Sequence, residues 1–257
     1  MTIPTYEIYA VKYAGPFIRP TPMMHWFQDM DQHVRINYYV FVIRGGGSTL
    51  IVDCGCSPTL ATERDLVGYV NPADVLKRID VVAEKVTHLV VSHIHFDHIS
   101  GIQMFPRSTI FVQETEFNFW MNDPIAKRAP FLHVTDPVGN QYLAGLKGTE
   151  RLRLIQGDQE IMPGIELLLC PGHTVGLQVV AVNTEQGIAI VGSDAAHIFS
   201  SYRTDIPSAI ITDMVAWMKS YDKIRAKASS IDLIFPGHDA ALIEDYPKVA
   251  EDVSRLV

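Results

Sequence analysis

Three histidines and one aspartate stand within six residues, directly after an apolar run, in the segment VSHIHFDHISG. Burying several such side chains without partners would cost too much free energy for a plain structural role, and a metal ion supplies the missing partner. In an extended segment alternate residues project to the same side, so His93 and His95 can bind one ion. Where the chain turns further on, Asp97 and His98 can reach a second ion. Mixed nitrogen and carboxylate donors favour zinc, and manganese, iron and cobalt also fit. The segment therefore predicts two divalent metal ions.

Three later apolar runs each end in a residue that can bind a metal. Residues 165–170, 188–191 and 232–235 lead into Pro171-Gly172-His173, Gly192-Ser193-Asp194 and Pro236-Gly237-His238. We expect each run to be a strand whose end presents the donor side chain. Three repetitions beside the first cluster are improbable as coincidence, so the sequence predicts that these residues complete the site.

Strand and helix signals alternate along the chain without a linker or a repeat. We expect a β-hairpin from residues 37–44 and 49–53, joined by a glycine-rich turn. Other strands are predicted at 87–92, 109–112, 178–182 and the three runs above, and helices at 72–79 and 212–228. The longest helix starts at Thr212 or Asp213 and carries an apolar face of Val215, Met218, Tyr221 and Ile224. This order predicts a layered α/β protein, with residues 1–257 in a single domain.

The charge, hydropathy and cysteine content limit the kinds of partner that the protein can bind. A net charge of -8 would repel nucleic acid and anionic membrane surfaces, and the densest basic stretch, residues 219–227, has the spacing of a solvated helix face. No run approaches a membrane span, and the first residues lack the pattern of a secretory signal. Three cysteines are too few for a disulfide framework. We therefore expect a cytoplasmic protein whose partner is a small molecule, with no nucleic acid and no membrane; a homodimer stays open.

The combined pattern resembles the metallo-β-lactamase superfamily, on the residues His93-x-His95-x-Asp97-His98, His173, Asp194 and His238. The resemblance implies an αββα four-layer sandwich of the α/β (α+β) class, with two mixed β-sheets face to face and helices outside. It also implies that His93, His95 and His173 bind the first metal, that Asp97, His98 and His238 bind the second, and that Asp194 bridges them. Asp53 would orient a ligand, although a plain strand-ending turn explains it almost as well.

A pair of ions of this kind implies hydrolysis, by attack of a hydroxide held between two cations about 3.5 to 4 Å apart. No serine elbow or cysteine pair competes, because G-x-S-x-G is missing and Cys54-Gly55-Cys56 has the wrong spacing. The flavodiiron branch has a glutamate at the position of His95. The glyoxalase II and RNA-processing branches have extra segments that this sequence lacks, and class B β-lactamases lack the bridging aspartate.

What remains is similar to the N-acyl homoserine lactonase group, which implies that the protein opens the ring of a small lactone. Asp97 would carry the proton to the leaving oxygen. Two alternatives stay open. One is another hydrolase of this fold, acting on a cyclic amide, aryl ester or phosphodiester; the other is a metal-containing protein that binds a small molecule without catalysis.

One position departs from the best-known lactonases, which have a tyrosine three residues after the bridging aspartate. This chain has His197 there, and we predict it to be catalytic together with Asp97 and Asp194; Tyr202 is a second candidate for the tyrosine's place. The departure favours an aromatic or polar lactone as an alternative to an acyl homoserine lactone. For the substrate pocket we single out Met24, Trp26 and Phe27 in one aromatic-rich segment and Trp120 in another, with core packing or a subunit interface as the equal alternative.

Overall fold

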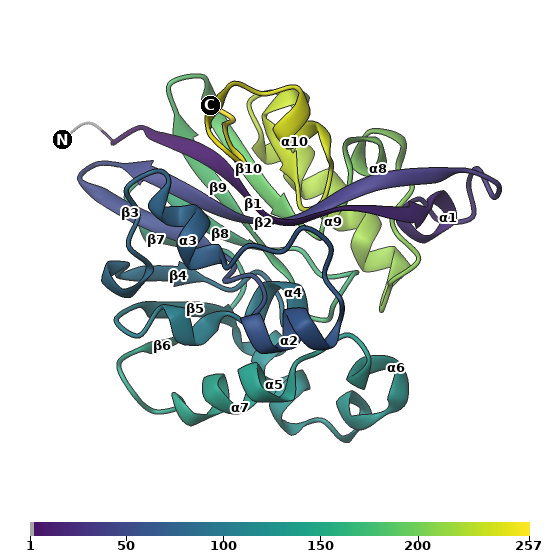
Figure 1. Cartoon of the computed structure of the whole chain (residues 1–257), viewed down its shortest axis with the longest axis horizontal. Coiled ribbons are helices and arrows are strands. Elements are labelled where there is room, and N and C mark those ends of the chain that lie inside the picture. Colours follow the sequence, from purple (N-terminus) through teal and green to yellow (C-terminus); the bar gives the residue numbers. More distant parts are fainter. Residues whose placement is uncertain (1–2) are drawn as a thin grey trace.

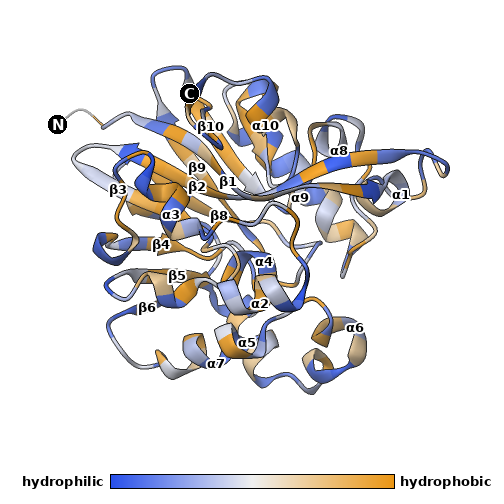
Figure 2. Cartoon of the chain, viewed as in Figure 1, coloured by the Kyte–Doolittle hydropathy of each residue, from blue (hydrophilic) through white to orange (hydrophobic). Residues whose placement is uncertain are grey.

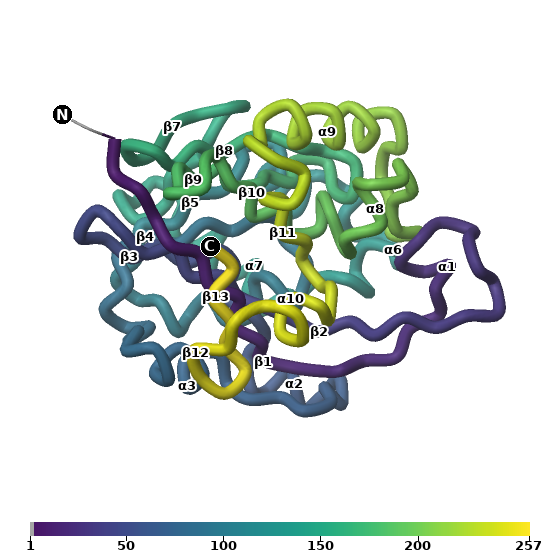
Figure 3. Tube along the Cα trace, turned by 90° about the horizontal axis from the view of Figure 1, so that it is seen from above, coloured from purple at the N-terminus to yellow at the C-terminus, as the bar shows by residue number. Residues whose placement is uncertain are grey.

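Two β-sheets lie face to face in the computed structural model, which describes residues 3–257, and helices cover both outer surfaces (Figure 1). Seen from above, α9 (Met214–Lys227) lies on one side of the paired sheets, and α2 (Pro58–Glu63) and α3 (Pro72–Lys77) lie on the other (Figure 3). The predicted four-layer αββα sandwich is confirmed.

The first sheet has the strand order β12-β13-β1-β2-β3-β4-β5-β6. Its strands are β1 (Tyr6–Pro20), β2 (His33–Gly45), β3 (Ser48–Val52), β4 (His88–Val90), β5 (Thr109–Gln113), β6 (Leu152–Ile155), β12 (Lys248–Ala250) and β13 (Val253–Arg255). The predicted hairpin is formed by β2 and β3, and Gly46 and Gly47 supply the positive φ angles of its tight turn. From β3 to β6 the strands are parallel, so their carboxyl ends reach the same edge.

The second sheet has the strand order β11-β10-β9-β8-β7. Its strands are β7 (Gln159–Met162), β8 (Ile165–Leu169), β9 (Gln178–Thr184), β10 (Gly187–Ser193) and β11 (Ile234–Pro236). Strands β10 and β11 are parallel, whereas the other neighbours are antiparallel. The ends of β8, β10 and β11 therefore bring three chain segments to one edge of the sandwich.

Three apolar layers hold the sandwich together. Side chains such as Phe41 of the first sheet and Val180 of the second meet between the sheets. Outside the first sheet, α3, α5 (Glu114–Asn122) and α7 (Pro137–Gly145) cover a second layer, and outside the second sheet α9 covers a third. Figure 2 shows the corresponding pattern, with hydrophobic colour along the strands and hydrophilic colour on many of the loops. Full burial of each large apolar side chain contributes about 1.5–3 kcal/mol.

The remaining helices are short. They are α1 (Thr21–Met24), α4 (Phe96–Ile99), α6 (Ala129–Leu132), α8 (Phe199–Thr204) and α10 (Ala241–Glu244). Single 3₁₀ turns occur at Ala83–Lys85, Ile102–Met104, Pro124–Lys127 and Ile231–Leu233. Within residues 3–257, no helix combines the length and the apolar character needed to cross a bilayer.

Three details of the sequence-based prediction need correction. Asp232 and Leu233, predicted as the start of a strand, lie in a 3₁₀ turn, and β11 begins only at Ile234. Strand β1 was not predicted; its register with β2 shifts twice around Gly15 and Pro16, residues that normally mark a loop. In α9 the buried face contains Trp217, Tyr221 and Ile224, whereas Val215 is 65% exposed. The helix is rotated from the predicted face because the Trp217 indole donates a hydrogen bond to the Ala195 carbonyl and is buried below the second sheet.

Candidate metal centre

The predicted donor residues meet at one edge of the sandwich in two neighbouring groups. In the first group, donor atoms of His93, His95, His173 and Asp194 all lie within 4.8 Å of one another. In the second group, Asp97, His98 and His238 do the same. The segment after β4 supplies four of these seven residues, and the ends of β8, β10 and β11 supply one each. The structure thus brings together every residue predicted to bind metal.

Asp194 stands between the two groups. Its Oδ2 lies 3.3 Å from His173 Nε2 and 3.7 Å from His93 Nε2, on the side of the first group. Its Oδ1 lies 2.9 Å from His238 Nε2 and 3.4 Å from His98 Nε2, on the side of the second. One carboxylate therefore turns one oxygen to each group, which is the arrangement of a bridging ligand.

The close approach around Asp194 depends on a glycine. A Cβ at Gly237 would lie 2.6 Å from Asp194 Oδ1 and 2.8 Å from the Ser193 carbonyl carbon. Contacts that short do not occur, so any larger residue would push the β11 turn away from the carboxylate. The Pro-Gly-His sequence after β11 thus allows His238 to come close to Asp194.

Several buried donor atoms in this centre lack a hydrogen-bond partner, namely His93 Nε2, His98 Nε2 and Asp194 Oδ1. Unpaired buried polar atoms are costly and uncommon in native proteins, so their concentration here calls for an ion. Burial, reinforced by neighbouring histidines, lowers the pKa of His93 and His95 well below the usual range. Burial alone would raise the pKa of Asp194, but His238 and the other histidines hold it well below its usual value. In the second group, burial alone would lower the pKa of His98 and His238, but the neighbouring aspartates raise it, so a cation that binds there must displace a proton. Neutral imidazoles and an ionised carboxylate are the forms that bind cations, and metal binding releases such protons, so the donor set fits divalent metal ions.

The imidazoles are fixed from behind by hydrogen bonds from the other ring nitrogen. His98 Nδ1 donates to Asp53 Oδ2 at 2.7 Å, His173 Nδ1 to the Ile210 carbonyl at 2.7 Å, and His238 Nδ1 to the Asn37 carbonyl at 2.9 Å. Such bonds set the tautomer, so that Nε2 of each ring presents its lone pair to the centre.

Among these hydrogen-bond acceptors, Asp53 makes the most contacts. Its carboxylate also accepts hydrogen bonds from the Ser92 amide at 2.7 Å, the Ser92 hydroxyl at 2.8 Å and the Ser193 hydroxyl at 3.2 Å. It thereby joins the end of β3 to the segments that carry His93 and Asp194. These contacts favour the orienting role over a plain strand-ending turn, although the φ angle of 65° at Asp53 is also typical of a turn.

Glu116 is a support that the sequence reasoning missed. This fully buried carboxylate accepts hydrogen bonds from the Ile94 amide at 2.9 Å, the Gly176 amide at 2.9 Å and the Trp120 indole at 2.7 Å. Ile94 stands between two donor histidines, and Gly176 lies three residues after His173. Glu116 therefore ties together two donor loops from different sheets. The sequence gives no signal for this role, since Glu116 resembles any acidic residue in the first turn of a helix.

His197 lies beside the centre, as predicted. Its Nε2 is 3.1 Å from Asp194 Oδ2, its ring is buried between those of His173 and Trp217, and burial lowers its pKa to about 4. The neutral ring carries one N–H, and Nε2 is the ring nitrogen that faces Asp194, whereas Nδ1 is buried.

A cavity of about 420 Å³ opens over the donor residues and gives a small molecule access to them. Asp97, Asp194 and His197 form part of its floor, and Met24 forms part of its wall, as predicted. Other wall residues were not foreseen; they include Arg19, Tyr38, Arg64, Leu66, Val134 and Ile210. They come from the far ends of β1 and β2 and from loops, where sequence spacing carries no information about which side chains meet.

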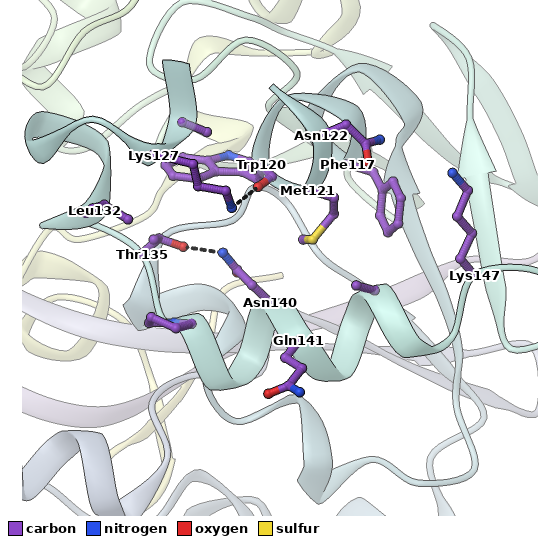
Figure 4. A pocket seen from close by; sticks show the side chains of 13 residues that line it. Phe117, Trp120, Met121, Asn122, Lys127, Leu132, Thr135, Asn140, Gln141 and Lys147 are labelled. Carbon is purple, nitrogen blue, oxygen red and sulfur yellow. Dashed lines mark hydrogen bonds between the residues drawn. The ribbon is translucent and has the colours of Figure 1, made fainter. Parts of the chain in front are cut away.

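The other predicted pocket residues lie elsewhere. Trp26 and Phe27 follow α1 and do not line this cavity, with 36% and 68% of their surface exposed. Tyr202 is buried beneath the second sheet, and its hydroxyl donates to the Ile234 carbonyl at 2.9 Å, so it does not take the place of the lactonase tyrosine. Trp120 lies behind His95, with 5.7 Å between ring centroids, and lines a separate pocket between α5 and α7 (Figure 4). In these four cases a large aromatic side chain serves packing or lies on the surface, outside the cavity.

A four-layer sandwich with histidines and aspartates gathered at one edge defines a class of metal-binding proteins. A family model described as the metallo-beta-lactamase superfamily matches residues 34–238. The chain therefore belongs to the metallo-β-lactamase superfamily.

Two curated relatives of this chain are both named N-acyl homoserine lactonase. An N-acyl homoserine lactonase of Bacillus thuringiensis is 29% identical over 181 residues, which make up 69% of this chain and 64% of the relative. The match thus spans just under two thirds of the relative's length. N-acyl homoserine lactonase AiiB of Agrobacterium fabrum is 22% identical over 218 residues, or 77% of this chain and 78% of the relative.

Solved structures agree on the fold. A quorum-quenching N-acyl homoserine lactone lactonase superposes with a TM-score of 0.76 at 21% identity, covering 97% of this chain and 98% of that one. AidC, described as a dizinc quorum-quenching lactonase, superposes with a TM-score of 0.73 at 18% identity, covering 93% and 90%.

Proposed function

We propose that this chain is a dinuclear metal-dependent hydrolase that opens the ring of a small lactone. The observation that carries the proposal is the Asp194 carboxylate, which turns one oxygen to each of two donor groups beneath an open cavity. The names of the relatives support a lactone as the substrate class. When bound, a pair of divalent cations supplies an acidified water as the nucleophile and polarises the ester carbonyl.

The chain's own residues account for the remaining steps. His93, His95 and His173 would hold the first ion, Asp97, His98 and His238 the second, and Asp194 both. Asp97 lines the cavity beside the second donor group, with Oδ2 3.7 Å from His238 Nε2. From this place it would accept the proton that the attacking water loses and pass it to the ring oxygen as the ester C–O bond breaks. His197 is placed to donate a hydrogen bond to the substrate's oxygen on the Asp194 side.

We also propose the metal, the cellular compartment and the assembly of the enzyme. Zinc fits the donor set of histidine nitrogens and aspartate oxygens best. Cys54, Cys56 and Cys170 are buried and unpaired, which supports a reducing cytoplasm. Residues 1–257 would act as one hydrolase domain, alone or as a homodimer, with no nucleic acid or membrane as partner.

The test is a substrate panel with purified, metal-loaded protein. Opening a lactone releases a carboxylic acid, so a pH indicator reports turnover; the panel also contains an aryl ester, a cyclic amide and bis(4-nitrophenyl) phosphate. We expect lactone turnover that a chelator abolishes and zinc restores. Turnover of the phosphodiester or cyclic amide without any lactone would transfer the assignment to another hydrolase of this fold. Tight binding of a lactone by loaded but inert protein would make it a binding protein.

A further inference from the structure

Two arginines line the cavity above the candidate metal centre. Arg19 lies near the end of β1, and Arg64 follows the last residue of α2. Both side chains are half-buried and border the same 420 Å³ cavity as Asp97 and Asp194. Segments far apart in the sequence thus deliver two positive charges to one binding space, in a chain whose net charge is -8.

Both guanidinium groups are seated on aromatic rings. The Cζ of Arg64 lies 3.9 Å from the centroid of Phe96, and one Nη2 hydrogen bond goes to the His133 carbonyl at 2.9 Å. The Cζ of Arg19 lies 5.1 Å from the centroid of Phe17. Stacking of this kind fixes the plane of a guanidinium while leaving donors at its edge free, because each group has five N–H bonds.

Neither arginine has an acidic partner among residues 3–257. The ion pairs of this part of the chain engage other arginines, such as Arg35 with Glu244, but not Arg19 or Arg64. The carboxylates of the cavity, Asp97 and Asp194, are turned to the histidines of the donor groups. The two guanidinium groups therefore retain unused capacity for an anion.

A neutral apolar substrate would fit this cavity poorly. It would remove water from two charged groups without offering them an acceptor, and such unpaired burial is costly. A carboxylate, by contrast, matches the planar fork of a guanidinium and forms charge-assisted hydrogen bonds with it. The lining of the cavity also includes the apolar side chains of Leu66, Val134 and Ile210, which can pack against a compact carbon ring.

We propose that the substrate is an anionic lactone, with its ester at the metal donors and a carboxylate on the far side of its ring bound by Arg19 and Arg64. This proposal rests on the proposed lactonase function and narrows its substrate class. The uncharged acyl homoserine lactones named for the relatives would then be inferior substrates.

The test compares two matched lactones, phthalide-5-carboxylate and phthalide-5-carboxamide, which differ in the charge on one ring substituent. We expect wild-type kcat/KM to favour the carboxylate by roughly 10- to 100-fold, the range that one hydrogen bond to a charged group contributes. Arg19→Met and Arg64→Met should each remove most of that preference. Arg35→Met is the matched control, because it breaks an exposed ion pair with Glu244 whose two residues do not line the cavity, and it should keep the preference intact.

Each outcome decides the question. Equal kcat/KM for the two lactones, or a preference that survives in both cavity variants, would overturn the proposal and leave the lactonase function standing. If no lactone is opened, the proposed function fails, and calorimetry with the matching lactam carboxylate and lactam carboxamide on metal-loaded protein decides instead. Tighter binding of the carboxylate that Arg19→Met or Arg64→Met abolishes would uphold the anion site; equal binding of the two lactams would sink it.

Discussion

Asp53→Asn is the sharpest test of how the second donor group is held. The aspartate accepts hydrogen bonds through both oxygens, from His98 and two serines at Oδ2 and from the Ser92 amide at Oδ1. An asparagine has one oxygen and one NH₂ group, so whichever way the amide is turned, a donor faces a donor. If the NH₂ faces His98 Nδ1, the ring is driven to the tautomer whose Nε2 carries a proton and cannot bind metal. Asparagine tolerates the positive φ at this position, so the backbone is not the cause of any loss.

The expected magnitude follows from that geometry. Removing a carboxylate that orients a metal-binding histidine weakens metal binding by about 10- to 100-fold. This corresponds to roughly 1.4–2.7 kcal/mol at 25 °C. The loss should fall on the ion held by Asp97, His98 and His238, because Asp53 contacts His98 directly. The other ion should be affected less.

The measurement is a competition between the protein and a chromophoric zinc chelator, which resolves two successive binding steps. Asp136→Asn is the matched control: this buried aspartate accepts hydrogen bonds from the amides of Val138 and Gly139 but from no histidine. We expect wild-type binding in the control and one weakened step in Asp53→Asn. Two unchanged steps in Asp53→Asn would refute the reasoning and leave Asp53 as a turn residue.

Three other substitutions probe separate parts of the molecule. Asp194→Ala should leave about one ion per chain by elemental analysis and reduce turnover by more than about 10³-fold, because the group shared by both sites is gone; two ions with near-normal turnover would contradict the bridge. His197→Ala should keep both ions but lower kcat by about 10²–10³-fold, the effect of one preorganised donor, and a loss of metal would show that His197 is a ligand. Asp252 pairs with Lys12 at 2.6 Å and Arg78 at 3.0 Å, and although burial alone would raise its pKa, these cations hold the pKa below its usual value. Its stabilisation is therefore present above the unfolded-state pKa of about 3.9 and is lost as the pH falls through the lower folded-state value. Thermal denaturation should show Asp252→Asn destabilised by at most about 1 kcal/mol at pH 7, and the difference from wild type should shrink at pH 3.

The meeting of the candidate metal donors at one edge was predictable because each follows a local signal. An apolar strand that breaks into a Pro-Gly turn fixes the position of the next side chain, and this holds for His173 and His238. The four-layer fold followed from the resemblance that these donors carry. Bounds of strands β5 and β9 also agree with the predicted ones to within two residues, since each contains an unbroken apolar run, Ile110–Val112 in β5 and Val179–Val182 in β9.

The cavity wall was not predictable in the same way. Arg19 and Arg64 reach it through the long β1–β2 hairpin, which extends beyond the first sheet in Figure 1, and through the loop after α2. Contacts of this type depend on tertiary packing and have no periodicity. Residue type misled the reasoning for Trp26 and Tyr202, because a large aromatic ring serves a core or a surface as readily as a pocket.

The donor residues are divided between the two sheets, and this division has a mechanical consequence. Four donors follow β4 of the first sheet and three follow strands of the second, so ions bound among them would act as cross-links between the halves of the sandwich. Removing the ions should let this edge open while the opposite edge stays closed by apolar packing. In hydrogen exchange, the amides of residues 93–98 and 172–176 should then lose protection well before those at the centre of β2 and β9.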